Sequence, residues 1–379
     1  MSPRYTSPLT GSQVFEADAR TIAPRFAGTA SLAILDGPYG LGKAAWDRVP
    51  RGGTLADLYQ GALDDVGTVC LPSASLYLWN TAAGWAELHP HVLARGWTFR
   101  ALITWDKGVA SMAGKVDTAG LRTWFDVTEV CGFYQREQVS ELGGPAQFIS
   151  YAAGASPGNS IRLWLHAERA RSGLTGDQLE EAVNEAGGKG TMVCRHSFIE
   201  SQWCMPTFDQ WKSLHAAWNR WADPAGRPYL QRAERGRVWD TSVGADHEAL
   251  RAEYEALRAP FTCPLGVGNV WTQGQVSGVE RLSVDGNTLH PCQKPILFAE
   301  RMIRASTRPG DTVWSPYGGT LRELVAAERM ARLDPADARK VITCELNQDG
   351  KDYIGAALEQ IGAEVRPRGG QIKLFGGAR

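Results

Sequence analysis

The feature that most constrains the fold is an alternation of short apolar runs with segments of helical spacing, in two separate parts of the chain. The apolar runs are 31–35, 75–79, 99–105, 127–134, 311–314 and 341–345. The segments with helical spacing are 54–66, with Thr54 as a possible N-cap, 85–94, 296–306, 321–332 and 352–361. Strand followed by helix, repeated, favours a parallel sheet covered on both faces. We therefore predict an α/β fold with a doubly wound, mostly parallel sheet.

The middle of the chain has a different character, because it is helix-rich and carries more charge, Trp and Arg. A helical pattern at 174–183, with Thr175 near its start, is followed by a glycine-rich turn and a second helical pattern at 191–201. This order is typical of a helix-turn-helix. Further helices are expected at 161–171, 206–221 and 247–258. We expect two halves of one α/β domain, residues 1–150 and 286–379, separated by a helical region at 151–285.

Charge and cysteine content exclude several classes of protein. The 379 residues carry a formal net charge of -1, so the chain is not a strongly basic protein that coats nucleic acid, although a local basic cleft is compatible with this balance. The seven cysteines lack CxxC spacing, which favours free thiols and no metal site. The polar N-terminus and the lack of an apolar run of about 18 residues predict a cytoplasmic protein without a membrane span.

A first candidate site follows the apolar run at 31–35. Asp36, Gly37, Pro38 and Tyr39 stand there, at the carboxyl edge of the predicted sheet, where open α/β sheets bind ligands. The Asp36 carboxylate and the Gly37 carbonyl can each accept one N–H of an amine, and Tyr39 can stack on a base taken out of a duplex. Taken alone, this loop favours an ordinary Asp-Gly-Pro turn over a site.

A second candidate loop, Ser315–Thr320, follows a strand and opens a helix. Its glycines allow close approach of a ligand to the backbone, and Glu345 at the end of the next strand can bind ribose hydroxyls. The loop is neither GxGxxG nor a phosphate loop, because it lacks the Lys, so a nucleoside cofactor without phosphates fits it. A third motif, His290-Pro291-Cys292-Gln293-Lys294-Pro295, has no further metal ligands at usable spacing.

These three motifs, in this order, resemble those of the DNA amino-methyltransferases that modify adenine N6 or cytosine N4, in the permuted arrangement called the beta class. That family carries an Asp-Pro-Pro-Tyr-type loop, a His-Pro-Thr-Gln-Lys-Pro box and an Asp-Pro-Phe-x-Gly-Ser-Gly-type cofactor loop. Flanking segments agree, among them Leu41–Lys43 with Trp46 and Asp47, Leu76–Trp79, Ile103–Lys107 and Glu300–Arg304. Asp18 resembles the acid that contacts the cofactor adenine. The resemblance covers about two-thirds of the chain.

The resemblance implies a Rossmann-like methyltransferase fold, S-adenosylmethionine as cofactor and direct in-line transfer to an exocyclic amine of a flipped base. The implied catalytic residues are Asp36, Gly37, Pro38 and Tyr39. The implied cofactor-binding residues are Asp18, Gln293, Lys294, Pro295, Ser315, Tyr317, Gly318, Gly319, Thr320 and Glu345. Asp at the first catalytic position resembles the adenine enzymes more than the cytosine enzymes, which more often have Ser there. Cytosine N4 transfer, or a DNA-binding protein with weakened catalysis, is the alternative.

Three positions depart from the family pattern. Gly37 stands where proline is usual; it keeps the carbonyl but loses the locked φ, so a less pre-organised loop is expected. Ser315 replaces the first acid of the cofactor loop, which is expected to weaken cofactor binding unless Asp18 and Glu345 suffice. Cys292 replaces Thr, which is a small change.

Double-stranded DNA is the implied partner, in a prokaryotic cell or a phage-infected host. The candidate recognition helix carries Arg195, His196, Ser197 and Gln202, because Arg reads guanine and Gln reads adenine in the major groove. Lys107, Lys115 and Arg122 lie in or beside a long loop that can contact phosphates. A solvated helical face, or ordinary surface charge, is the alternative for both groups. The resemblance is compatible with a homodimer and with a restriction partner.

Overall fold

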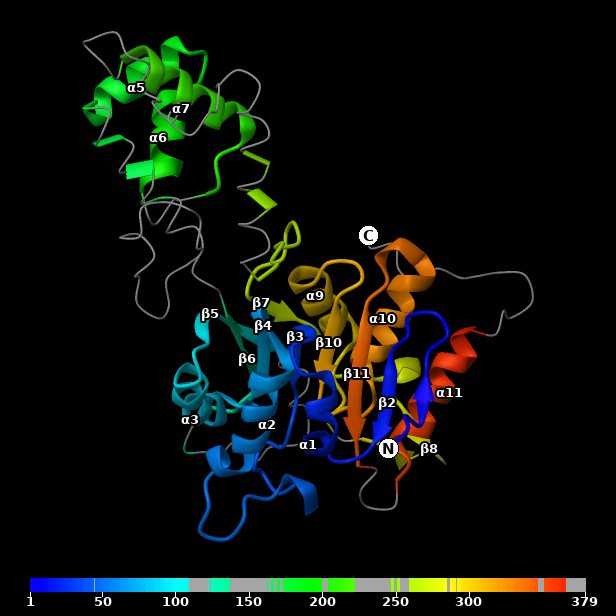
Figure 1. Cartoon of the computed structure of the whole chain (residues 1–379). Coiled ribbons are helices and arrows are strands. Elements are labelled where there is room, and N and C mark those ends of the chain that lie inside the picture. Colours follow the sequence, from blue (N-terminus) through cyan, green and yellow to red (C-terminus); the bar gives the residue numbers. More distant parts are fainter. Residues whose placement is uncertain are drawn as a thin grey trace. The chain divides into compact units, whose positions relative to one another are not determined.

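A computed structural model describes the part of the chain that carries the three motifs and much of the helical region. The described residues are 1–43, 45–108, 122, 124–136, 162, 165–166, 169–170, 173–199, 204–221, 247–248, 251–252, 259–284, 287–290, 292–346 and 351–365. They belong to two compact units, one formed by 1–136 with 260–379 and the other by 137–259 (Figure 1). The helices expected at 161–171 and 247–258 lie mostly outside the described residues.

The first unit is built on a nine-stranded sheet with the order β1-β2-β11-β10-β3-β4-β6-β5-β7. In that order the strands are Tyr5–Thr6, Gln13–Glu16, Lys340–Glu345, Thr312–Ser315, Ala30–Leu35, Cys70–Asn80, Thr128–Gln135, Thr98–Asp106 and Val270–Thr272. Five strands that are consecutive in the sheet, β2, β11, β10, β3 and β4, are parallel to one another. A separate antiparallel pair joins β8 (Ser283–Val284) and β9 (Asn287–Thr288). The predicted mostly parallel α/β sheet is confirmed.

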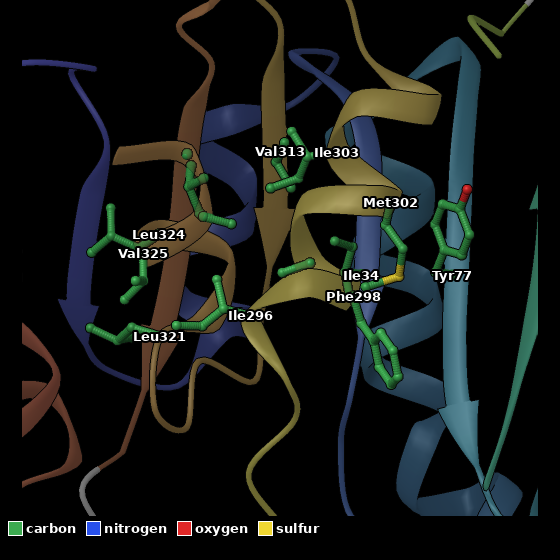
Figure 2. Packing of buried hydrophobic residues seen from close by; sticks show 14 of the residues in the cluster. Ile34, Tyr77, Ile296, Phe298, Met302, Ile303, Val313, Leu321, Leu324 and Val325 are labelled. Atoms are coloured by element: carbon green, nitrogen blue, oxygen red, sulfur yellow. The ribbon is translucent and has the colours of Figure 1, made fainter. Parts of the chain in front are cut away.

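Helices cover both faces of this sheet, which explains why its central strands are apolar throughout. In β3, Leu32 and Ile34 belong to one buried cluster, and Ala33 and Leu35 belong to the other. Helices α9 (Ile296–Ser306), α10 (Arg322–Leu333) and α11 (Tyr353–Val365) contribute to the first cluster. Helices α1 (Ala19–Ile22), α2 (Leu55–Val69) and α3 (Ala82–Leu93) contribute to the second. Figure 2 shows side chains of α9 packed toward the strands of the sheet.

Several local predictions are confirmed in this unit. Thr54 caps α2 through a full capping box with Asp57, and α9 has the predicted bounds. Short 3-10 helices lie at Ala23–Phe26, Ala45–Asp47, Gly278–Glu280 and Pro335–Asp337.

All seven cysteines are free. No helix among the described residues is long and apolar enough to cross a membrane.

Because β10 pairs with β3, the N-terminal and C-terminal parts of the sheet lie side by side. From β3 the chain continues through α2 to β4, and from β10 it continues through α10 to β11 on the opposite side (Figure 1). The direction of winding therefore reverses between β3 and β10, which is the place where doubly wound sheets bind ligands. The carboxyl ends of four adjacent parallel strands, β2, β11, β10 and β3, meet at that edge.

Strand β6 runs against its neighbours, which differs from the simple parallel repeat expected at 127–134. Thr128 pairs with Asp106 of β5, and Val130 pairs with Asn80 of β4, both antiparallel. The chain goes from β5 to β6 and places β6 between β4 and β5, so it must return in the opposite direction. As a result, the beginning of β6 lies at the edge where β4 and β5 end.

The second unit contains three described helices, α5 (Gly176–Glu185), α6 (Gly190–Phe198) and α7 (Phe208–Trp221). Thr175 caps α5 through a capping box with Gln178, as the sequence predicted. A Cβ at Gly190 would overlap the carbonyl oxygen of Glu180, so only glycine allows α6 to begin this close to α5. The core of this unit includes Leu179, Val183, Phe198, Trp211, Leu214 and Trp218.

Candidate active site

A cavity of about 460 Å³ opens at the carboxyl edge of the first unit, at the reversal between β3 and β10. It is lined by all four predicted catalytic residues and by eight of the ten predicted cofactor residues. These are Asp36, Gly37, Pro38 and Tyr39, with Asp18, Gln293, Lys294, Tyr317, Gly318, Gly319, Thr320 and Glu345. Pro295 and Ser315 are the two that do not line it. The fold thus brings together motifs that lie far apart in the sequence.

A buried carboxylate fixes the backbone of the catalytic loop. Asp47 is 2% exposed, and its Oδ1 accepts hydrogen bonds from the backbone N–H groups of Tyr39 at 2.6 Å and Gly40 at 2.9 Å. Its Oδ2 accepts a third from the Lys43 N–H at 3.1 Å. A carboxylate bound to three backbone donors holds the turn in one conformation. The loop is therefore ordered by Asp47.

Close packing explains the glycine at position 37. A Cβ there would lie 2.7 Å from the Tyr317 ring and 2.8 Å from the Tyr59 hydroxyl, so neither alanine nor proline fits without movement. The sequence led us to expect a freer loop because proline is missing. The structure instead shows a buried Gly37 against Tyr317, with the loop anchored a few residues later.

Lys294 joins the catalytic loop to the third motif. Its ammonium Nζ donates to Asp36 Oδ1 at 2.8 Å and Oδ2 at 3.0 Å, and it lies 3.0 Å from the Tyr39 hydroxyl. It also lies 3.0 Å from Glu129 Oε2, and its side chain is only 7% exposed. The Tyr39 hydroxyl donates to the same Glu129 oxygen at 2.9 Å. Lys294 is therefore part of the catalytic loop's own network, in addition to lining the cavity.

Glu129 completes this network, and the sequence did not identify it. It is the second residue of β6, and its Oε1 forms an ion pair with Lys107 Nζ at 2.7 Å. In a parallel strand this residue would lie at the opposite edge of the sheet, whereas the antiparallel course of β6 brings it to the site. Lys107 was expected to contact phosphates. Its side chain is 13% exposed and is engaged with Glu129, so it neutralises a buried carboxylate instead.

The charges in this network determine its protonation. Burial raises the pKa of Asp36, and Lys294 opposes that effect. Burial would also raise the pKa of Glu129, but the ammonium groups of Lys294 and Lys107 outweigh it and lower the pKa to about 2. Burial would lower the pKa of Lys294, but Asp36 and Glu129 raise it. Two carboxylates and two ammonium groups thus form a buried cluster that is electrically neutral.

At the other end of the cavity, Glu345 is bound to backbone. Its Oε2 accepts the Gly319 N–H at 2.6 Å, and its Oε1 accepts the Leu346 N–H at 3.0 Å. These two bonds fix the orientation of the Glu345 carboxylate at the cavity wall. Asp18 caps α1 and pairs with Arg20 at 2.9 Å. A Cβ at Gly318 would lie 2.6 Å from the Thr343 hydroxyl, which requires glycine in this turn.

Gln293 and Pro295 have supporting positions. The Gln293 amide donates to the Glu280 carbonyl at 2.6 Å and accepts the Leu282 N–H at 3.0 Å, so its polar atoms hold the preceding segment. Pro295 is the N-cap residue of α9. The sequence expected both to bind cofactor. Gln293 lines the cavity, Pro295 does not, and both also hold the backbone from which Lys294 projects.

An aromatic pair, Trp46 and His290, also lines the cavity. Their rings are stacked with centroids 5.6 Å apart. Burial lowers the pKa of His290 to about 4, with the cation of Lys294 acting in the same direction. Nδ1 accepts the Cys292 N–H at 3.2 Å, so the neutral ring carries its proton on Nε2. In the described parts of the chain, no group of three or more His, Cys, Asp or Glu side chains could hold a metal ion.

The predicted DNA-contacting residues are placed in different ways. On α6, Arg195 is exposed and His196 is half-buried. Ser197 is 2% exposed in the core of the second unit, which differs from a base-contacting position. Arg122 is exposed. Lys115 and Gln202 lie outside the described residues.

Comparison with known proteins finds similarity to DNA methyltransferases over part of the chain. The family model for N6/N4 enzymes, described as DNA methylase, matches residues 231–359. Over 94 residues the chain is 34% identical to the DNA adenine methyltransferase YhdJ of Escherichia coli K12, covering 25% of this chain and 27% of that protein. Over 76 residues it is 33% identical to the type II methyltransferase M1.MboII of Moraxella bovis, covering 20% of this chain and 29% of that protein. The aligned segments thus span less than a third of these relatives.

Among solved structures, the PvuII DNA methyltransferase, described as cytosine-N4-specific, aligns with a TM-score of 0.47 and 13% identity, covering 94% of this chain and 88% of that one. Residues 231–359 of the chain are similar to the N6/N4 DNA methylase family.

Proposed function

We propose that the protein transfers a methyl group from S-adenosylmethionine to the exocyclic N6 amine of adenine in double-stranded DNA. The observation that carries this proposal is the shared cavity. One end holds the Asp36 carboxylate and the Gly37 backbone, and the other holds the Gly318–Gly319 turn and Glu345. An amine acceptor and a nucleoside pocket therefore open into the same space.

The residues of the cavity fit this cofactor. Its volume of about 460 Å³ lies in the range of pockets that bind small molecules. Glu345, held by two backbone N–H groups, would accept the ribose hydroxyls, and Asp18 would lie at the adenine end. The lack of a phosphate-loop lysine suits a ligand without phosphates. When bound, the cofactor supplies an electrophilic methyl group on a sulfonium.

The protein's part is to hold and polarise the target amine. The Asp36 carboxylate accepts one N–H and the Gly37 carbonyl accepts the other, which directs the nitrogen lone pair toward the methyl group. Positive charge develops on the nitrogen during attack, and the negative charge of Asp36 stabilises it. The half-buried Tyr39 offers a ring face for the flipped base. Together with Asp36, the side chains of Lys294, Glu129 and Lys107 form a cluster without net charge, which exists before the base arrives.

The preference for adenine rests on Asp36 at the first position of the loop, and cytosine N4 is the competing target. The same reading gives the second unit the task of recognising DNA. The exposed Arg195 on α6, close behind α5 in a helix-turn-helix order, is suited to contact a guanine edge in the major groove.

The test is incubation with labelled S-adenosylmethionine and mixed-sequence duplex DNA, followed by nucleoside analysis. We expect N6-methyladenine. N4-methylcytosine would correct the target base, and the absence of both would refute the activity. Asp36→Ala should abolish transfer while cofactor binding, measured by calorimetry, stays nearly unchanged. Asp64→Ala, which changes an exposed aspartate on α2, should leave transfer intact.

A further inference from the structure

The cofactor loop lacks the acid that its family pattern has at position 315, but a different acid lines the cavity. Ser315 is 1% exposed and lies behind the cavity wall. Its hydroxyl is 3.3 Å from Oε2 of Glu323, which lies in the first turn of α10. Glu323 is 8% exposed and lines the cavity. The side chain of Glu323 thus lies in front of Ser315, between it and the ligand space.

The surroundings of Glu323 contrast with those of the other buried acids in the site. Its polar contacts are the Ser315 hydroxyl and its own backbone amide. The charged groups that act on it are Asp36, from the loop after β3, and Arg322 of α10. The Arg322 guanidinium donates to the Thr320 carbonyl at 2.7 Å and 2.9 Å and to Gln360 at 2.9 Å.

This balance keeps the carboxyl partly protonated at neutral pH. Burial and the negative charge of Asp36 raise the pKa of Glu323, whereas its own backbone amide, Arg322 and the Ser315 hydroxyl lower it, and the net pKa is about 7. The cluster around Asp36 contains its own ammonium groups, but the Glu323 carboxyl has a hydroxyl and an amide as its hydrogen-bonding neighbours. A buried carboxyl of this kind ionises when a cation enters the cavity beside it.

We propose that Glu323 binds the cationic end of the cofactor, and so takes the place of the acid missing at position 315. The inference rests on the proposed function, because the cofactor carries a sulfonium and an ammonium. Glu323 and Glu345 line the same cavity from different elements, Glu323 from the first turn of α10 and Glu345 from the end of β11. Binding of the cation releases the carboxyl proton to solvent and leaves a carboxylate paired with the bound positive charge.

The experiment measures binding instead of turnover. Dissociation constants are determined by calorimetry at pH 5.5 and pH 7.0 for S-adenosylmethionine, for S-adenosylhomocysteine, which keeps only the ammonium, and for methylthioadenosine, which has neither charge. For the wild type we expect affinity for S-adenosylmethionine to rise by about tenfold between these two pH values, because proton release lowers affinity below the carboxyl pKa. Titrations in buffers of different ionisation enthalpy should report a proton released at pH 5.5 to 6.5.

The variant Glu323→Gln should remove this pH dependence and weaken S-adenosylmethionine binding at pH 7.0 by about tenfold, the worth of one charge-assisted hydrogen bond. Methylthioadenosine binding should be unchanged. If S-adenosylhomocysteine binding is weakened equally, the cation is the ammonium; if it is not, the cation is the sulfonium. Glu328→Gln is the control, because Glu328 is also buried on α10 but does not line the cavity.

Two results would overturn the assignment. Unchanged S-adenosylmethionine affinity in Glu323→Gln would show that the carboxyl does not meet the cation. Equal weakening of methylthioadenosine would show that the variant only deforms the cavity. Failure of the proposed function looks different, because the wild type itself would then bind none of the three ligands or would bind them without transferring a methyl group.

Discussion

Two regions of the cavity wall hold buried negative charge in different ways. Around the loop after β3, Asp36 and Glu129 are balanced by Lys294 and Lys107 within 3.0 Å of a carboxylate oxygen. At the start of α10, Glu323 has the Ser315 hydroxyl at 3.3 Å as its side-chain partner. Both regions are largely withdrawn from water, where an unbalanced charge is costly. The protein therefore neutralises the Asp36 region itself and leaves the Glu323 region for a ligand to neutralise.

This difference suits the two ligands of the proposed reaction. The target base is neutral when it arrives, so the loop that receives it needs a charge balance that exists beforehand. The cofactor brings a cation, so a carboxyl that ionises as it binds adds affinity for that cation alone. A site with Lys294 near Glu323 would repel the cofactor, and a site with Asp36 lacking Lys294 would bury an unpaired carboxylate.

The largest effect should follow from removing the Lys294 ammonium from the neutral cluster around Asp36. Lys294→Met leaves Asp36 and Glu129 buried with a single ammonium group, and removal of one partner from a buried ion pair costs about 3–5 kcal/mol. We expect the free energy of unfolding in urea to fall by that amount and transfer to be lost. Lys43→Met removes an exposed ammonium at the same cavity and should change stability by less than about 0.5 kcal/mol. Equal stability of both variants would show that the Lys294 cluster is not tightly coupled.

Replacement of Glu129 tests the same cluster with a smaller change in structure. Glu129→Gln keeps the shape of the side chain and leaves an amide oxygen that can still accept the Tyr39 hydroxyl. The two ammonium groups, Lys294 and Lys107, then face Asp36 as the one remaining carboxylate. Excess positive charge opposes the cation that develops on the amine, so kcat should fall by roughly a hundredfold, similar to loss of one electrostatic contact. Cofactor affinity should change little. A loss of cofactor affinity with kcat unchanged would contradict a positioning role for Glu129. Glu300→Gln, on the outer side of α9, is the control.

The contact between the two loops gives a smaller effect. Gly37→Ala introduces a Cβ at 2.7 Å from the Tyr317 ring, and overpacking of this kind costs about 1–3 kcal/mol. In a Tyr317→Ala background the same change should cost less, and the difference in the double-mutant cycle measures the contact. Gly268→Ala, where no atom lies within 4 Å, should be neutral. Additive costs would show that the Tyr317 ring moves aside.

Much of this arrangement could be predicted from sequence, and the failures have physical causes. The apolar runs and the helical spacing of apolar residues between them predicted the sheet, because strands buried on both faces are apolar throughout. Motif order predicted that Asp36, Lys294 and Glu345 share a site. Glu129 was missed because hydrophobic patterning does not reveal strand direction, and an antiparallel strand moves its first residues to the other edge. Glu323 was missed because acids in the first turn of a helix are common, and burial appears only in the packed structure.

The packing around the cofactor loop also could not be predicted. Leu321, next to the loop, adopts a left-handed conformation with φ of 53° while its side chain is fully buried. Such a conformation in a non-glycine residue costs of order 1 kcal/mol and persists where surrounding contacts offset it. The burial of Leu321 beside Leu324 and Val325 supplies those contacts (Figure 2). Sequence favours glycine in such turns, so only the packing explains a leucine here.

A further effect concerns the ligand-free protein and Glu323 alone. Because burial raises its pKa above the unfolded value, the folded state holds its proton more tightly than the unfolded state does. The stabilisation is fully present below the unfolded pKa and is lost as pH rises through the folded pKa of about 7. The thermal midpoint of the wild type should therefore fall, relative to that of Glu323→Gln, between about pH 4.5 and pH 7 and stay level above it. Asp36 and Glu129 titrate in both proteins, so the difference between the two midpoints isolates Glu323. A constant difference across this range would mean that the carboxyl is already ionised before a cation arrives, and the contrast between the two regions of the cavity wall would disappear.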